Sequence, residues 1–229
     1  MTEKIPAESN GSSPQVKVCG LTRVEEAVAC AALGANAIGL VFYPPSPRFV
    51  GDALAREIAA SLPARVWPVG VFVNEPCSVI MKKVERCRLK AVQLHGAEPP
   101  YLIYELLGAG VAVIKSLFVN GRPAVRDASS FPASAYLIEA GGGPLPGGNA
   151  MSWNWGEVKG FSGERSCILA GGLDHENVVG AINEVSPDAV DVSSGVESAP
   201  GRKNMAKVKA FLEAVRQSRP ERKPRRIFQ

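Results

Sequence analysis

The sequence lacks a long hydrophobic run: its longest apolar stretch, residues 37–43, falls far short of the ~18 residues that indicate a membrane span. Its first residues also lack the apolar core and cleavage site of a secretory signal. Hydrophobic residues make up 46% of the 229, charged residues 21% and aromatic residues 7%, which excludes a disordered chain and a fibre. We therefore expect a globular, cytoplasmic protein without a membrane partner.

Paired cysteines and clustered histidines are also missing. The five cysteines are odd in number and none has Cys-x-x-Cys spacing, while the two histidines, His95 and His175, lie far apart. In the absence of a signal sequence, this pattern predicts reduced thiols rather than disulfides. It also argues against a zinc site, so we expect no metal.

Excess charge is missing from most of the chain. The net charge of +4 equals the charge of residues 217–229, so residues 1–216 are formally neutral. A nucleic-acid-binding protein normally carries its basic residues on a folded face, so we expect no nucleic-acid partner. We interpret 217–229 as a basic, disordered tail that is solvated rather than a polyanion-binding arm. The polar residues 1–14 are expected to form a second disordered tail.

What the chain does contain is a regular alternation of two patterns. Short apolar runs rich in β-branched residues predict buried strands, and the stretches between them carry apolar residues at helical spacing. The predicted strands are 16–19, 37–42, 66–73, 91–94, 111–117, 135–139, 166–170 and 189–192. Eight strand–helix units of about 25 residues favour a single (β/α)₈ barrel over 15–216 rather than an open sheet. The sixth helix is the weakest, because only 153–161 could be helical.

The chemistry of such a barrel lies at the carboxyl ends of its strands, where two reactive side chains are expected. Cys19 closes the first predicted strand and could act as a base or nucleophile if nearby positive charge lowered its pKa; the alternative is a small buried apolar residue. Glu139 closes the sixth and is a candidate general acid or base, or else a rim residue paired with a surface cation. Gln93 and His95 close the fourth and are interpreted as polar residues that satisfy the top of the barrel.

Other strand ends suggest anion binding. Arg48 follows the proline-rich loop 44–47, which would hold its guanidinium stiffly for a carboxylate; the alternative is a solvated surface arginine. The turns at Gly171-Gly172 and Ser194-Gly195 follow the last two strands, where barrels of this kind commonly bind phosphate through backbone N–H groups. Ordinary tight turns would look the same.

Six motifs in order resemble the phosphoribosylanthranilate isomerase family of tryptophan biosynthesis. They occupy residues 17–22, 42–48, 69–74, 92–96, 170–173 and 191–197, and the resemblance runs from about Val16 to Arg216. The resemblance implies a (β/α)₈ barrel without a cofactor. It also implies an Amadori rearrangement, in which N-(5-phosphoribosyl)anthranilate becomes 1-(2-carboxyphenylamino)-1-deoxyribulose 5-phosphate.

The resemblance also implies roles for single residues. Cys19 matches the base that takes the proton from C2′, and Arg48 matches the residue that holds the anthranilate carboxylate. Gly171, Gly172, Ser194 and Gly195 match the phosphate site.

The sequence departs from the family pattern at the general acid, an aspartate in the family, where it has Glu139. The loop 147–155 that follows also departs from the family pattern. We expect Asp191 to bind substrate, and it is the next candidate for the general acid after Glu139.

Two other functions stay open at this point. One is an isomerase for a related phosphosugar with a different amine group, against which the retained Arg48 argues. The other is a catalytically weak protein that binds a phosphate ligand on the same barrel, against which the carboxyl group of Glu139 argues. The expected partner is a small phosphosugar–anthranilate substrate, and both a monomer and a homodimer remain open.

Overall fold

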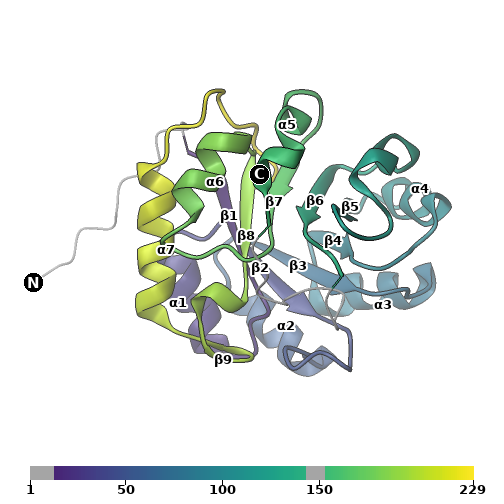
Figure 1. The fold of residues 1–229 in the computed structure, drawn as a ribbon. Helices are drawn as coiled ribbons and strands as arrows, with labels where there is room; N and C mark the ends of the chain where they lie inside the picture. The colour runs from purple at the N-terminus through teal and green to yellow at the C-terminus, as the bar shows by residue number, and fades with distance from the viewer. Residues whose placement is uncertain (1–12, 143–152) are drawn as a thin grey trace, which may run out of the picture.

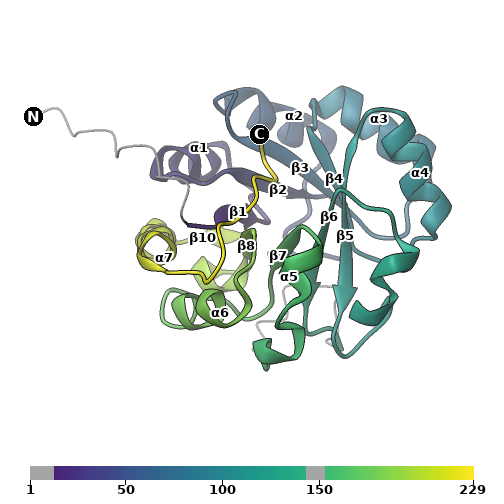
Figure 2. The ribbon, with the colours of Figure 1, turned by 90° about the horizontal axis from the view of Figure 1, so that it is seen from above.

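The computed structural model describes residues 13–142 and 153–229. Eight parallel strands form a closed barrel in the order β1 to β8, and helices cover its outside (Figure 1 and Figure 2). Closure is made by β1, which pairs with β2 on one side and with β8 on the other. The (β/α)₈ barrel predicted from the alternating pattern is therefore confirmed.

The strands lie close to their predicted positions. They are β1 (Gln15–Cys19), β2 (Ala37–Val41), β3 (Trp67–Phe72), β4 (Ala91–Leu94), β5 (Ala112–Phe118), β6 (Ala135–Glu139), β7 (Cys167–Leu169) and β8 (Ala189–Val192). A short antiparallel pair, β9 (Glu197–Ala199) and β10 (Arg202–Lys203), follows the barrel.

The outer layer consists of α-helices and short 3₁₀ turns. The α-helices are α1 (Val24–Leu33), α2 (Asp52–Ser61), α3 (Cys77–Cys87), α4 (Pro100–Gly108), α5 (Phe161–Glu164), α6 (Val178–Val185) and α7 (Met205–Gln217). The 3₁₀ turns are η1 (Val125–Ser130), η2 (Trp155–Val158) and η3 (Ser194–Val196). None of the helices described is both long and apolar enough to cross a bilayer.

Within the described residues, the fifth and sixth units contain no full helix. After β5 the chain forms only η1, because Gly121, Pro123 and Pro132 break up the segment in which a helix would form. After β6 the weak helix expected over 153–161 is replaced by η2 and the four-residue α5. Every other unit has a helix of eight residues or more.

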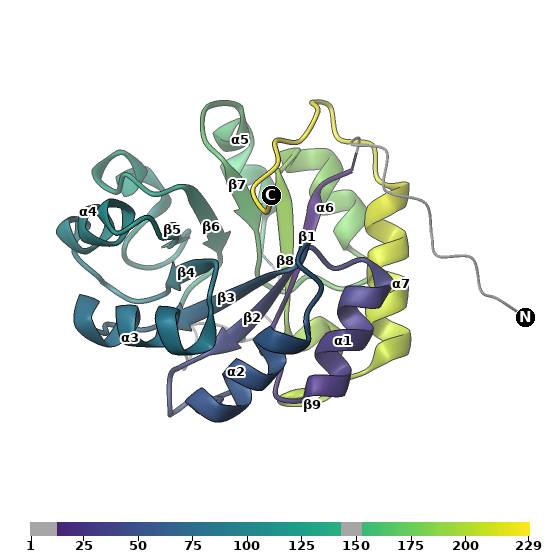
Figure 3. The ribbon, with the colours of Figure 1, turned by 180° about the vertical axis from the view of Figure 1, so that it is seen from behind.

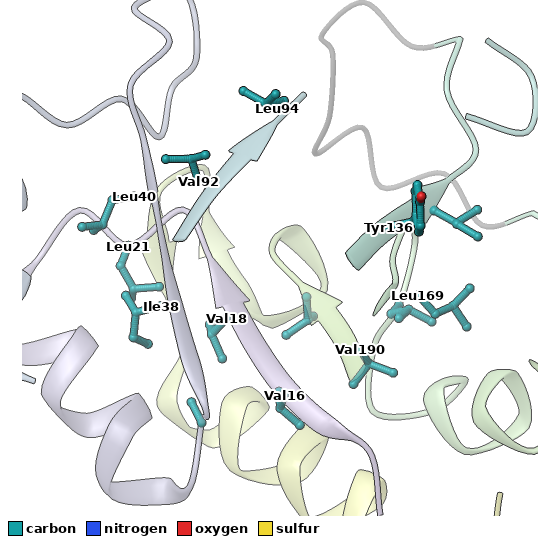
Figure 4. Close-up of a cluster of buried hydrophobic side chains, with 14 of the residues drawn as sticks. Val16, Val18, Leu21, Ile38, Leu40, Val92, Leu94, Tyr136, Leu169 and Val190 are labelled. Carbon is teal, nitrogen blue, oxygen red and sulfur yellow. The ribbon is translucent and has the colours of Figure 1, made fainter. Parts of the chain in front are cut away.

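Alternation along each strand separates an outer core from the barrel interior. Val16 and Val18 of β1 point outward and join the large apolar cluster under the helices (Figure 4). Gln15, Lys17 and Cys19 occupy the alternate positions and face the interior, where Lys17 is level with Asp191 of β8. The inward residue that closes each strand therefore lies at the mouth of the barrel.

The C-terminal segment is not the disordered tail that its composition suggested. After α7, which packs beside α1 (Figure 3), it crosses the end of the barrel over β8 and β1 (Figure 2). Phe228 is 3% exposed and joins the inner cluster at the floor of the barrel. The side chain of Gln15 donates to the carbonyl of Phe228 and accepts from the backbone amides of Ile227 and Phe228.

Two of the basic residues in this segment neutralise a buried carboxylate. Asp188, the residue before β8, is fully buried, and its oxygens lie 2.6 Å from Arg222 Nη2 and 3.4 Å from Arg225 Nη1. A buried carboxylate without a partner would be strongly destabilising. Two of the positive charges that predicted a solvated tail, those of Arg222 and Arg225, therefore neutralise a carboxylate inside the fold. The companion prediction for residues 1–14 lies outside the described residues, except for residues 13 and 14.

Truncating Phe228 to alanine is expected to lower the free energy of unfolding by about 2–4 kcal/mol, near the range for buried aromatic side chains. For a chain of this size the melting temperature should fall by roughly 5–12 °C, measured by calorimetry. Turnover should be unchanged, because the floor is opposite the mouth. The matched control is Lys223→Ala, an exposed position in the same segment, and equal melting temperatures for the two variants would refute the docking.

Candidate active site

Cys19 ends β1 on its inward face and is 8% exposed. The neighbouring position on β2 is Gly39, where an added Cβ would lie only 2.5 Å from the sulfur. A side chain at this position would therefore displace the thiol. The sulfur packs with Val41 and Val71, and with Tyr43 at the edge of the cluster.

The electrostatic surroundings of Cys19 are mixed. Burial raises the pKa of the Cys19 thiol; the positive charges of Lys17 and Lys203 oppose this rise without cancelling it, and the charge of Asp191 adds to it. Lys17 lies one inward position below Cys19 and is itself fully buried. Its Nζ is 2.8 Å from Asp191 Oδ1. Asp191, expected to bind substrate, is thus engaged with Lys17 beneath the thiol.

Arg48 is not the solvated arginine of the alternative interpretation, since it is only 6% exposed. Its Nε and Nη2 donate to the two carboxylate oxygens of Glu197 at 2.9 and 2.7 Å. Its aliphatic part lies so close to Gly20 that an added Cβ there would clash with it. Glu197 also accepts from Lys203 Nζ at 2.7 Å. The guanidinium is therefore fixed by a carboxylate 149 positions away as well as by its proline-rich loop.

These contacts also set the charge of Glu197. Its burial would raise the pKa of the Glu197 carboxyl, but the hydrogen bond from Arg48 and the charge of Lys203 outweigh burial and lower it. The group is therefore a carboxylate, and two cations share it. The cluster keeps a net positive charge close to Cys19.

Glu139 ends β6 on its inward face and is 8% exposed. Its Oε1 lies 2.9 Å from Nε2 of His95, the residue that follows β4. The expected alternative, a rim glutamate paired with a surface cation, is therefore wrong. On the other side, Gly171 is so close to the Cβ of Glu139 that a side chain there would crowd it.

The two turns predicted to bind phosphate pack against each other. An added Cβ at Gly195 would clash with the backbone oxygen of Leu173, so only glycine allows this approach. The first turn is ordered by Asn177, whose amide donates to the carbonyl of Gly172 and whose side-chain oxygen accepts from the amide of Asp174. Gly171, Gly172, Ser194 and Gly195 are all half-buried, with Ser194 starting the 3₁₀ turn η3.

The partners of the candidate residues could not be predicted from the sequence alone. Lys17 was not expected as a charge beneath Cys19, although the two-residue spacing puts both on one face of a strand. Glu197 belongs to a motif of the resemblance but was given no role there, and His95 was expected only to satisfy the top of the barrel. No local signal marks Lys203, because the hairpin of β9 and β10 turns it back toward Glu197.

The fold and these strand ends define a class: a (β/α)₈-barrel enzyme whose mouth carries a thiol, a carboxyl group and a clamped arginine. The family model described as N-(5'phosphoribosyl)anthranilate (PRA) isomerase matches residues 16–214. The chain therefore belongs to the N-(5'-phosphoribosyl)anthranilate isomerase family.

Individual relatives agree with this assignment. A protein of Desulfatibacillum aliphaticivorans named N-(5'-phosphoribosyl)anthranilate isomerase is 50% identical over 93% of this chain and 98% of its own. The crystal structure of phosphoribosyl anthranilate isomerase from Thermotoga maritima has a TM-score of 0.80 at 37% identity, covering 88% of this chain and 98% of that one. A family structure in complex with reduced 1-(o-carboxyphenylamino)-1-deoxyribulose 5-phosphate has a TM-score of 0.77 at 36% identity, with the same coverage.

Proposed function

We propose that this chain converts N-(5'-phosphoribosyl)anthranilate to 1-(2-carboxyphenylamino)-1-deoxyribulose 5-phosphate, with Glu139 as general acid and Cys19 as general base. The chain is an isomerase of tryptophan biosynthesis. The observation that carries the two roles is that a carboxyl group and a thiol close two different strands on their inward faces at the same mouth. Acid and base must act on different atoms of one sugar, and this arrangement provides two separate groups.

The chemistry follows from the difference between substrate and product. Glu139 gives a proton to the ring oxygen as the bond between that oxygen and C1′ breaks, and the anthranilate nitrogen supplies the electron pair that forms an iminium at C1′. Cys19 then takes the proton from C2′ in its thiolate form, which is the minority form near neutral pH because burial raises the pKa of the thiol. The electrons of that C–H bond form an enolamine and neutralise the nitrogen. The enol oxygen then gives its proton to the Glu139 carboxylate while C1′ takes a proton from the Cys19 thiol, which completes the aminoketose and returns both groups to their starting states; no oxidant or reductant is consumed.

The anionic ends of the substrate have separate binding groups. Arg48 binds the anthranilate carboxylate: its bonds to Glu197 use Nε and Nη2, and within the described residues Nη1 makes no hydrogen bond. The adjoining turns at Gly172 and Gly195 bind the phosphate through backbone N–H groups, because the first amides of a helical turn have no partner within it. Asp191 acts on substrate binding indirectly, by orienting Lys17.

Replacing Arg48 by alanine is expected to weaken kcat/KM by about 10–100-fold, equivalent to roughly 1.5–3 kcal/mol for hydrogen bonds to a charged group. Arg48→Lys should recover only part of the lost kcat/KM. A guanidinium can donate two parallel hydrogen bonds to Glu197 and still present a donor to the ligand, whereas the ammonium group of lysine cannot. Steady-state kinetics of the two variants make the test. A lysine variant indistinguishable from the wild type would remove the carboxylate role from Arg48.

The function itself is tested by rescue of a tryptophan auxotroph that lacks this isomerase. Growth without tryptophan supports the proposal, and the Glu139→Gln variant should fail to rescue. A chain that only binds a phosphate ligand would give no growth, and an isomerase for another amine would act on its own phosphosugar but leave the auxotroph unrescued. We assign the enzyme to the cytoplasm as a monomer or homodimer; the Thermotoga maritima relative is described as a dimer from which monomers were generated.

A further inference from the structure

Behind Glu139 runs a chain of buried polar side chains from neighbouring strands. His95 Nε2 lies 2.9 Å from Glu139 Oε1, and the other ring nitrogen, Nδ1, lies 2.7 Å from both Gln93 Nε2 and Ser116 Oγ. Gln93 is 1% exposed and Ser116 fully buried. The ring of Phe118 packs edge-on against the imidazole, with centroids 5.7 Å apart. The imidazole is therefore held from several sides.

With the Gln93 amide oriented as it is in the structure, the hydrogen bonds assign the proton of the neutral His95 ring to one nitrogen. The amide nitrogen of Gln93 can only donate, so Nδ1 accepts and is unprotonated in the neutral ring. The proton of the neutral imidazole is then on Nε2, which donates to Glu139 Oε1. Because Glu139 Oε1 accepts the hydrogen bond from Nε2–H, it cannot also carry an acidic proton that points toward His95. The transferable proton of a protonated Glu139 is accordingly carried by the other oxygen, Oε2.

We propose that His95 is a positioning residue, which fixes the carboxyl group of Glu139 and confines its transferable proton to Oε2. The inference rests on the proposed role of Glu139 as the general acid. Shortening the side chain by one carbon–carbon bond withdraws the carboxyl by about 1.5 Å, beyond hydrogen-bond reach of Nε2. A glutamate side chain is therefore long enough to hydrogen-bond His95 from this position, and an aspartate side chain is not.

A matched pair of amide variants tests the role of His95. The side-chain nitrogen of glutamine can occupy the position of the imidazole Nε2 and still donate to Glu139, whereas asparagine reaches only as far as Nδ1. Because a misplacement near 1 Å costs on the order of 10²-fold, His95→Asn is expected to lower kcat by about 10–100-fold with KM nearly unchanged. His95→Gln should restore most of kcat. An asparagine variant with wild-type kcat, or a loss confined to KM, would overturn the inference.

A double-mutant cycle separates positioning from a merely structural role. If His95 acts through Glu139, adding His95→Asn to the Glu139→Gln variant should lower kcat no further. An equal loss in both backgrounds would refute positioning. The control is Tyr136→Phe, which removes a buried hydrogen bond from the outward face of the same strand and should lower the melting temperature while leaving kcat intact.

The same cycle distinguishes two kinds of failure. Wild-type activity of the Glu139→Gln variant would overturn the acid assignment and this inference together. Loss of activity with Glu139→Gln but not with His95→Asn would leave the proposed function standing and overturn the inference alone.

Discussion

Replacing Glu139 by glutamine is expected to lower kcat by about 10²–10⁴-fold, the usual contribution of a positioned general acid. The substitution keeps an oxygen that can accept from His95 Nε2, so the fold and the hydrogen bond are retained while the acidic proton is lost. Steady-state kinetics at saturating substrate measure the effect. Glu164→Gln makes the same chemical change at an exposed carboxylate that, among the residues described, pairs with its neighbour Arg165, and it should leave kcat unchanged.

Glu139→Asp then asks whether the site has adapted to the longer acid. We expect a further loss rather than a gain relative to glutamate, because the aspartate carboxyl would lose its 2.9 Å contact with His95. A rise in kcat would mean that the site still fits aspartate better and that glutamate lowers its activity. If both variants matched the wild type, another group would be the acid, and Asp191 would be examined next despite its bond to Lys17.

The second large effect is expected at Cys19. Cys19→Ala should lower kcat by at least ~10²-fold with little change in KM, as the loss of a general base does. Cys30→Ala is the matched control, because Cys30 is a fully buried thiol on α1 and its removal should leave kcat intact. Full activity of the Cys19 variant would exclude the thiol from the mechanism.

The protonation state of Cys19 can be tested directly. Since burial outweighs the charges of Lys17 and Lys203, the pKa of the Cys19 thiol is raised, and its thiolate should appear at higher pH than that of a free cysteine. The ultraviolet absorbance of thiolate is titrated in the wild type and in Cys19→Ala, and the difference isolates this residue. A thiolate that formed below the ordinary pKa would show that the cations dominate.

The barrel could be predicted because its signal is repeated eight times and each repeat is local. The position of Cys19 and Glu139 at the carboxyl ends of single predicted strands likewise sufficed to put them at the mouth. The partners of these groups could not be predicted in the same way, since Glu197 and Arg48 meet only after the chain has closed on itself. Contacts between distant residues leave no periodic trace in a single sequence.

The docking of the C-terminal segment also could not be predicted from local sequence. Its composition is that of a solvated tail, and nothing adjacent to Phe228 indicates burial. The space that Phe228 enters is lined by small side chains from four different strands, which belong to Ala37, Ala91, Ala135 and Ala189. That space exists only in the assembled barrel, so the local pattern predicted the opposite of what forms.

The bond between Gln15 and Phe228 also has a temporal consequence. Its two partners are 213 positions apart, so the first strand of the barrel is synthesised long before the residue that seals the floor beneath it. Asp188 is likewise synthesised before Arg222 and Arg225, the two residues that neutralise it. On the ribosome, a nascent chain can arrange its eight strands and still hold an open floor with an unneutralised carboxylate. The segment 222–228 is translated after all eight strands, and it is this segment that closes the floor and neutralises Asp188.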